Sequence, residues 1–417
     1  MNRCFWFSKQ AIFSFIVVCL LLFIPIEAIQ SQDNAPSAPE RIILNLTDRP
    51  ATQQAVTWRT KIPVLKPQAQ VVLARSTSDL EVRARTVIAR TDTLIQAEQI
   101  FYYHSALLDS LLPNSIYAYR VGDGAIWSEW NQFSTAVSEE APFEFVYIGD
   151  PQNSILSICS RVFRMAYQQA PRARFWLLTG DLVNNGGNDA EWQEFFDGLG
   201  WIARTTPMLM LPGNHEYVKI KRDGESVRNL TSLWRPQFSL PTNGPKELEE
   251  TVYYVDYQHV RLIALNGNEQ LEVQAAWLAE VLKNNPNRWT IVAIHQPIYS
   301  SAKGRDNKQL QQLFLPLFDN YGVDLVLQGH DHCYSRSHKL RAGKVVDNPS
   351  PGTVYVISVS GPKIYELNVQ YQPLMAKMDS GKQWFQVISV GHDRLVFQAW
   401  TANGELYDSF ELKKDVR

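Results

Sequence analysis

Five short polar segments in the chain combine Asp, Asn, Gln and His, and each follows an apolar run. Carboxylate and amide oxygens together with neutral imidazole nitrogens are the ligands that hard and borderline metal ions prefer. Four of the eight histidines lie in these segments, and glycine precedes most of them, which suits a chain that turns sharply beside an ion. Singly each segment is typical of an ordinary turn, but together they predict a metal centre. The segments are Gly149-Asp150-Pro151-Gln152, Gly180-Asp181, Gly213-Asn214-His215-Glu216, His295-Gln296-Pro297 and Gly329-His330-Asp331-His332.

The elements that must position these segments alternate between strand and helix. Continuous apolar strands separated by helices are typical of a sheet covered on both faces. The carboxyl ends of the strands in such a sheet meet at one edge, so we expect the five polar segments to converge there. Buried strands are predicted at 143–148, 175–178, 208–211, 289–294 and 325–327, helices at 155–169, 189–199, 270–283 and 308–320, and shorter strands that would make the sheets mixed at 252–256, 260–265, 353–359 and 395–400.

The preceding part of the chain has a different rhythm. Short runs that alternate apolar and polar residues are separated by turn signals such as Leu112-Pro113-Asn114, which predicts an all-β sandwich of about 100 residues. A stretch rich in Ser, Glu and Pro at 138–142 predicts the boundary. We therefore expect a multidomain protein, with a β-sandwich at 38–137 followed by an α/β domain of mixed sheets flanked by helices at 142–412.

Length and composition bound the class of protein. The chain has 417 residues, with 45% hydrophobic and 20% charged residues, which leaves room for two globular domains. A net charge of -2 without a dominating Lys/Arg block gives no electrostatic footprint for nucleic acid. The expected partner is therefore a small molecule, and the sequence is silent on oligomeric state.

The N-terminus predicts export. Arg3 and Lys9 precede an apolar run at 11–26 and then Ala28, which is the order of a signal peptide at 1–28 and predicts a periplasmic, secreted or cell-surface protein. The apolar run is only slightly shorter than the ~20 residues that span a bilayer, so an uncleaved membrane anchor is the alternative. Removal of this segment leaves Cys159 and Cys333, for which buried free thiols are the simplest expectation.

The five polar segments resemble the ordered motifs of the calcineurin-like metallophosphoesterases. The resemblance runs from about residue 142 to 397, and residues 39–59 and 117–133 are similar to the fibronectin-III-like domain that precedes the catalytic domain in purple acid phosphatases. The resemblance implies a binuclear metal centre in which Asp181 bridges the ions. It implies that Asp150 and His332 hold the first ion, and that Asn214, His295 and His330 hold the second.

The resemblance also implies a reaction, the hydrolysis of phosphate esters and most of all of phosphomonoesters. A hydroxide that bridges the two ions would attack phosphorus in line, without a covalent enzyme intermediate. His215 would contact the phosphoryl oxygens and protonate the leaving oxygen, and Asn214 would share in substrate binding. A phosphodiesterase or nucleotide-cleaving enzyme is the alternative, and a non-catalytic surface binding protein is a third reading.

Two positions depart from the family pattern. Asn184 stands where purple acid phosphatases have the Tyr that ligates Fe(III), and Gln152 stands where the broader family has His. The amides of Gln152 and Asn184 are additional candidates for direct metal ligands. Because an amide is a weaker ligand than imidazole or phenolate, the choice among Fe, Mn and Zn stays open.

Overall fold

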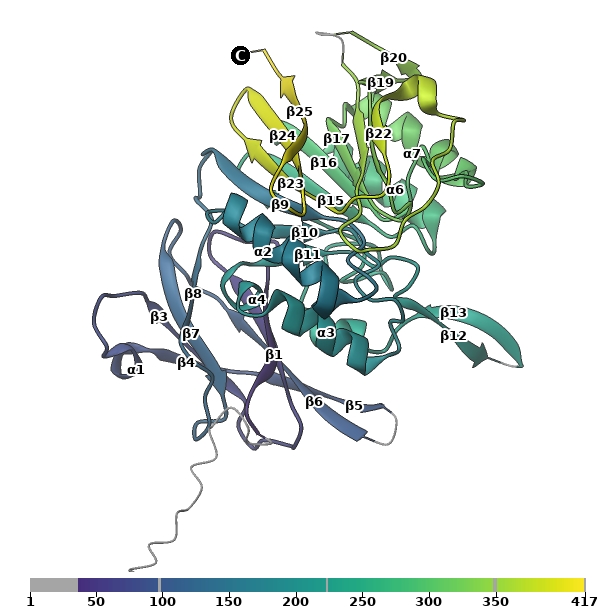
Figure 1. Ribbon diagram of the computed structural model, residues 1–417. Helices are drawn as coiled ribbons and strands as arrows, with labels where there is room; N and C mark the ends of the chain where they lie inside the picture. The colour runs from purple at the N-terminus through teal and green to yellow at the C-terminus, as the bar shows by residue number, and fades with distance from the viewer. Residues whose placement is uncertain (1–36, 97–98, 223, 348–350, 416–417) are drawn as a thin grey trace, which may run out of the picture.

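The computed structural model describes residues 37–96, 99–222, 224–347 and 351–415 (Figure 1). The predicted signal peptide at 1–28 lies outside these residues, so export stays a prediction. Within the described part of the chain, no helix is both long and apolar enough to cross a bilayer.

The first sheet of the α/β part is built on three parallel strands. These are β9 (Phe143–Ile148), β10 (Trp176–Leu178) and β11 (Met208–Met210), which lie side by side in chain order. The antiparallel strands β23 (Trp384–Val390), β24 (Arg394–Thr401) and β25 (Leu406–Lys413) extend the sheet on the β9 side.

The second sheet packs on the first and has a parallel centre with antiparallel edges. The parallel strands are β15 (Val260–Leu265), β16 (Trp289–Ile294), β17 (Leu325–Gln328) and β21 (Val354–Ile357). The antiparallel strands are β14 (Tyr253–Tyr257), β18 (Tyr334–Ser337) and β22 (Met375–Asp379). The predicted α/β domain with mixed sheets is therefore confirmed.

The continuous apolar strands are explained by burial on both faces. Along β16, Ile291 and Ala293 belong to the core cluster between the two sheets, whereas Val292 and Ile294 belong to the cluster under α6 (Leu271–Lys283) and α7 (Lys308–Tyr321). The other face of the first sheet is covered by α2 (Ser160–Gln169) and α3 (Asp189–Leu199) (Figure 1). A π-helical turn at Ile155–Cys159 directly precedes α2. Cys159 and Cys333 are both buried and free, as expected.

The N-terminal part is a β-sandwich, as predicted. Its core contains Trp58 and Tyr119, one from each sheet, and both are fully buried. One sheet contains β1 (Glu40–Asn45), β2 (Gln54–Thr60), β5 (Arg90–Gln96) and β6 (Gln99–Leu108), and the other contains β3 (Gln68–Leu73), β4 (Arg85–Ile88), β7 (Ile116–Gly122) and β8 (Asn131–Ser134).

Two features of the fold were not anticipated from the sequence. Strand β1 pairs in parallel with β11 as well as antiparallel with β2, so one ten-stranded sheet runs from the sandwich into the α/β part. A hairpin of β12 (Tyr217–Arg222) and β13 (Glu225–Leu230) follows the Gly213–Glu216 segment and projects from the body of the molecule (Figure 1). The domain boundaries at 38–137 and 142–412 stay predictions.

The remaining elements are short. They are α1 (Leu80–Arg83), α4 (Ile202–Thr205), α5 (Trp234–Gln237), a 3-10 turn at Gln372–Leu374, and a small ribbon of β19 (Leu340–Arg341) and β20 (Lys344–Val345).

A largely buried group of charged and amide side chains, here called the interface cluster, joins the sandwich to α3; its members Asp189 and Gln193 are partly exposed. The guanidinium groups of Arg41 and Arg59 lie 2.7 Å and 2.8 Å from Oδ1 of Asp189. Gln237 Oε1 accepts a further hydrogen bond of 3.0 Å from Arg41, and Gln193 Oε1 accepts one of 3.1 Å. Each of these five side chains has its buried polar atoms paired within the described structure.

Candidate metal centre

The ends of five parallel strands bring the predicted ligands together at one edge of the two sheets. Asp150 follows β9, Asp181 follows β10 and Asn214 follows β11, while His295 follows β16 and His330 and His332 follow β17. The ligand atoms of Asp181, His295 and His330 all lie within 4.8 Å of one another, and so do those of Asp150, Asp181 and His332. Asp181 is the residue that both groups share.

The two carboxylate oxygens of Asp181 have different surroundings. Oδ1 accepts the backbone N–H of His215 at 2.9 Å. Oδ2 lies 3.2 Å from Nε2 of His295 on one side and 2.9 Å from the amide nitrogen of Gln152 on the other. One oxygen is thus held by the backbone, and the other is placed between the two groups, as a bridging ligand requires.

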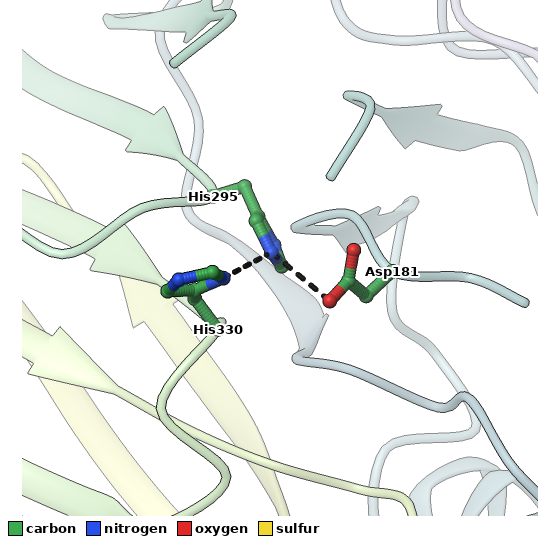
Figure 2. A group of neighbouring side chains, drawn as sticks. All are labelled: Asp181, His295 and His330. Carbon is green, nitrogen blue, oxygen red and sulfur yellow. Dashed lines mark hydrogen bonds and ion pairs between the residues drawn. The ribbon is translucent and has the colours of Figure 1, made fainter. Parts of the chain in front are cut away.

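In the group of Asp181, His295 and His330, the ring of His295 lies between the carboxylate of Asp181 and the ring of His330 (Figure 2). Nδ1 of His295 lies 2.8 Å from the carbonyl oxygen of Thr179, and donation to this acceptor leaves Nε2 facing the centre. Nε2 in turn lies 3.1 Å from Nδ1 of His330. The geometry presents two imidazole nitrogens and one carboxylate oxygen to a common point.

The pKa values of this group show its electrostatics. Burial lowers the pKa of His295, but the carboxylates of Asp181 and Asp150 outweigh it and raise that pKa to about 9. Burial and the neighbouring charge of His295 lower the pKa of His330 to about 2. The metal-free group therefore holds a proton on His295, which a bound cation would replace.

In the group of Asp150, Asp181 and His332, the side-chain amide of Gln152 contacts both Asp181 and His332. Nε2 of His332 lies 3.6 Å from Oδ2 of Asp150 and 3.0 Å from the amide nitrogen of Gln152, which is fully buried. Burial, followed by the repulsion from Asp181, raises the pKa of Asp150 well above its usual range. Burial and the nearby ammonium of Lys363 lower the pKa of His332 to about 3, so this imidazole is neutral and able to bind a metal.

The donor atoms at this edge fit two metal ions. Buried acceptors without a partner are unfavourable, and a metal ion satisfies such oxygens and nitrogens. Within the described structure, four candidate ligands each keep a buried atom without a hydrogen-bond partner: Oδ1 of Asp150, Oε1 of Gln152, Oδ1 of Asn214 and Nδ1 of His332.

The backbone around the centre is strained where the ligands lie. Asp150, Asp181, His330 and His332 have φ of 36°, 48°, 73° and 47°, in the left-handed region that non-glycine residues rarely adopt. The adjacent glycines are required by contact, because a Cβ at Gly213 would lie 2.2 Å from Oδ1 of Asp181. A Cβ at Gly329 would lie 2.1 Å from Oδ1 of Asp150.

Two buried carboxylates outside the ligand set hold the loops. Glu216 accepts the backbone N–H groups of Asp181, Leu182 and Gly213 at 2.9, 2.8 and 2.7 Å, so it ties two ligand segments together. Burial and the charge of Asp181 raise the pKa of Glu216 to about 7.

Asp331 plays a similar part for the segment after His295. Its Oδ2 accepts the Ser300 hydroxyl at 2.7 Å and the N–H groups of Ser301 and Ala302 at 2.6 and 3.0 Å. Sequence reasoning gave Asp331 no role, although its place between His330 and His332 was the available signal.

His215 and Asn184 lie beside the two groups. Nε2 of His215 is 3.9 Å from Oδ2 of Asp181, and the backbone carbonyl of Asn184 contacts Nδ1 of the same ring. Asn184 is exposed, and the group by which it contacts the His215 ring is its backbone carbonyl. The ligand roles proposed for Gln152 and Asn184, like the rest of the ligand set, stay predictions.

Comparison with known proteins agrees with this architecture. Residues 143–334 match the family model of the calcineurin-like phosphoesterases, and residues 39–135 match the model of the purple acid phosphatase N-terminal domain. Acid phosphatase type 7 of Homo sapiens is 29% identical over 350 residues, which cover 76% of this chain and 75% of that protein.

Two further proteins show the extent of the likeness. An uncharacterized protein of Mycobacterium tuberculosis is 28% identical over 342 residues; the match covers 72% of this chain and 62% of that relative's length. The purple acid phosphatase isolated from yellow lupin (Lupinus luteus) seeds has the same fold, with a TM-score of 0.74 at 21% identity, covering 91% of this chain and 75% of that one.

Proposed function

Because this chain belongs to the calcineurin-like phosphoesterases and carries a purple acid phosphatase N-terminal domain, we propose that it hydrolyses phosphate esters, phosphomonoesters most of all. The observation that carries the proposal is that two ligand groups share one carboxylate, Asp181. A relative named as an acid phosphatase supports the choice of phosphomonoesters.

Each ligand has a defined task in this proposal. Asn214, His295 and His330 would hold one metal ion, Asp150 and His332 would hold the other with the amide oxygen of Gln152 as a further candidate, and Asp181 would bind both. Two bound ions would supply Lewis acidity at the phosphoryl group and lower the pKa of a water held between them. The Thr179 carbonyl and the His215 N–H keep His295 and Asp181 in the orientation that this requires.

His215 is the proposed proton donor. Its Nδ1 is held by the Asn184 carbonyl, and its Nε2 lies on the side of Asp181, where a phosphoryl oxygen and the leaving oxygen would come within reach. Asn214 stands next to it in the chain and shares the contact with substrate. The ions are Fe, Mn or Zn, and the absence of Tyr at position 184 argues against a purple Fe(III) centre.

Replacement of the shared carboxylate is the sharpest test. We expect Asp181→Asn to lower the turnover of an aryl phosphate monoester at least about 1000-fold, because both ions lose a charged ligand. The measurement compares wild type and variant after metal stripping and reloading with Mn, Zn or Fe, on a matched monoester and diester. Circular dichroism of the metal-free proteins checks that the fold is kept.

The possible outcomes distinguish a phosphatase from a phosphodiesterase and from a binding protein without catalysis. Unchanged activity in Asp181→Asn would refute the bridging role, and faster diester than monoester hydrolysis by wild type would replace a phosphatase by a phosphodiesterase. Failure of the wild-type protein to retain or rebind any metal would favour a binding protein without catalysis.

A further inference from the structure

Two loops meet beside the metal centre and are joined by backbone hydrogen bonds. The first is the segment 301–305 before α7, and the second is the segment 361–368 after β21. The N–H of Lys303 donates to the carbonyl of Glu366 at 2.9 Å, and the N–H of Asn368 donates to that of Ser301 at 2.7 Å. The pair therefore forms one connected rim.

The second loop also lies directly against the ligand segments. The N–H of Gly361 donates to the carbonyl of Asp150 at 2.9 Å, and the N–H of Tyr365 donates to the carbonyl of His332 at 3.3 Å. A Cβ at Gly361 would lie 2.4 Å from the carbonyl oxygen of Gln152. The backbone of this loop is thus held next to the group of Asp150, Asp181 and His332.

Two cations from these loops share one aromatic ring, and we call Arg305, Lys363 and Tyr365 the rim cluster. The Arg305 guanidinium carbon lies 4.7 Å and the Lys363 ammonium 5.3 Å from the centre of the Tyr365 ring. The ring of Tyr365 is itself 4.7 Å from the ring of His332. The cluster is therefore in van der Waals reach of a proposed metal ligand.

The positive charge of the rim cluster is only partly balanced by the protein. Arg305 donates to the carbonyl of His330 at 2.7 Å and lies 3.4 Å from Oδ1 of Asp331. Lys363 is half-buried and makes no hydrogen bond or ion pair with any residue that the structure describes. Lys363 is thus a cation without a carboxylate partner among the described residues, and an anionic group of a bound molecule near it would meet an unbalanced positive charge.

We propose that the rim cluster binds a second anionic group of the substrate, a phosphate or a carboxylate, beside the phosphoryl group that is cleaved. This inference rests on the proposed function, because the rim cluster lies next to that centre. In this proposal Lys363 determines the substrate specificity. Esters with a second negative charge close to the scissile group bind better than esters of neutral alcohols. Arg305, held by the His330 carbonyl, positions the ring and adds its charge.

Binding of three small inhibitors to the metal-reloaded protein tests this assignment. Methylphosphonate carries one anionic group, phosphonoacetate adds a carboxylate and methylenebisphosphonate adds a second phosphonate. We expect wild type to bind at least one of the last two about tenfold more tightly than methylphosphonate. Lys363→Met should reduce this preference to less than about twofold, and Lys363→Arg should keep it. Calorimetry gives the dissociation constants without turnover.

Lys303→Met is the matched control, because Lys303 is an exposed lysine on the facing loop whose ammonium is already paired with Glu366 at 2.8 Å. It should leave the preference unchanged. Loss of the preference for phosphonoacetate alone would identify a carboxylate site, and loss for methylenebisphosphonate alone would identify a phosphate site.

No preference in wild type, or equal weakening of all three ligands in Lys363→Met, would overturn the inference. A wild-type protein that binds these inhibitors selectively but hydrolyses no ester would refute the proposed function and leave the anion site standing.

Discussion

The interface cluster and the metal centre are both largely buried and rich in charge, and they differ in how many of their polar atoms have a hydrogen-bond partner in the protein. At the interface, Asp189 receives two guanidinium groups and every buried polar atom of the five side chains is paired within the described structure. At the metal centre, Asp150, Gln152, Asn214 and His332 each keep a buried atom that no described residue satisfies.

This difference separates a structural role from a functional one. A saturated cluster has already used its hydrogen-bonding capacity to join two parts of the fold, so it has none left for a ligand. A cluster with unpaired buried polar atoms and with left-handed backbone at Asp181 and His332 is unfavourable by itself. A bound ligand such as a metal ion would satisfy those atoms. We therefore expect changes at the interface to affect stability, and changes at the centre to affect metal binding.

The largest effect on stability is expected from the interface cluster. Asp189→Asn keeps the shape of the side chain but leaves the buried Arg41 without a carboxylate, and removes one of the two that contact Arg59. The free energy of unfolding should fall by about 3 kcal/mol, as for other broken buried ion pairs. Chemical denaturation measures it, and activity per folded molecule should stay within about twofold of wild type.

Asp197→Asn is the control for this variant, since Asp197 lies on the same helix but is exposed, and Asn keeps the Oδ1 that accepts the amide of Gln193 at 2.9 Å. A loss of stability of the same size in both variants would show that the helix, and not the interface, is responsible. A large loss of activity in folded Asp189→Asn would break the proposed separation between the two clusters.

Glu216 tests the separation between structural and functional clusters more strictly, because its carboxylate lies inside the metal centre but already accepts hydrogen bonds from the protein. It accepts backbone N–H groups from the segments that carry Asp181 and Asn214, but it is not itself a proposed ligand. We expect Glu216→Gln to weaken metal binding by about 10- to 100-fold, as for other residues that orient ligands. Metal titration of the stripped protein measures this, with Glu225→Gln on the exposed hairpin as the control.

A pure loss of stability in Glu216→Gln, with unchanged metal affinity, would place Glu216 with the interface cluster. Equal weakening in Glu225→Gln would assign the effect to overall charge instead of loop geometry.

The fold could be predicted from the sequence where local pattern and burial agree. Strand β16 is a continuous apolar run because both of its faces are covered, and the predicted range 289–294 coincides with the observed one. The pairing of β1 with β11 could not be predicted, because it joins Asn45 to Met208 through backbone atoms that every residue carries. The β12–β13 hairpin was missed although the sequence carried a signal for it: Asp223-Gly224 separates two short runs that alternate apolar and polar residues.

The sequence predicted which residues at the strand ends form the site, but not the contacts that arrange them. The sequence placed Asp181 and His330 at the ends of apolar runs, and the structure brings them together. It could not reveal that the Asn184 carbonyl holds His215, because carbonyl contacts leave no trace in side-chain identity. Lys363 and Tyr365 belong to no recognisable pattern, and they become neighbours of His332 only through the path of the chain after β21.

The smallest expected effect concerns a saturated histidine in the sandwich. His104 is buried, and its two ring nitrogens lie 3.0 Å and 2.9 Å from the hydroxyls of Thr60 and Thr91. Burial lowers the pKa of His104 from 6.5 to about 4, so the unfolded chain takes up a proton at higher pH than the folded protein. The contribution of neutral His104 to the free energy of unfolding is therefore fully present above pH 6.5 and is lost as the pH falls towards 4.

We expect this loss to be about 2 kcal/mol between pH 7 and pH 5, and His104→Gln to remove it, because Gln can bond both hydroxyls without titrating. Denaturation of the metal-free proteins at the two pH values gives the difference, and His338→Gln, at an exposed position, should leave it unchanged. Activity per folded molecule should not change in His104→Gln, because the residue lies in the sandwich. A shift in the pH dependence of turnover instead would show that the sandwich and the metal centre are coupled, since the ten-stranded sheet through β1 and β11 connects them.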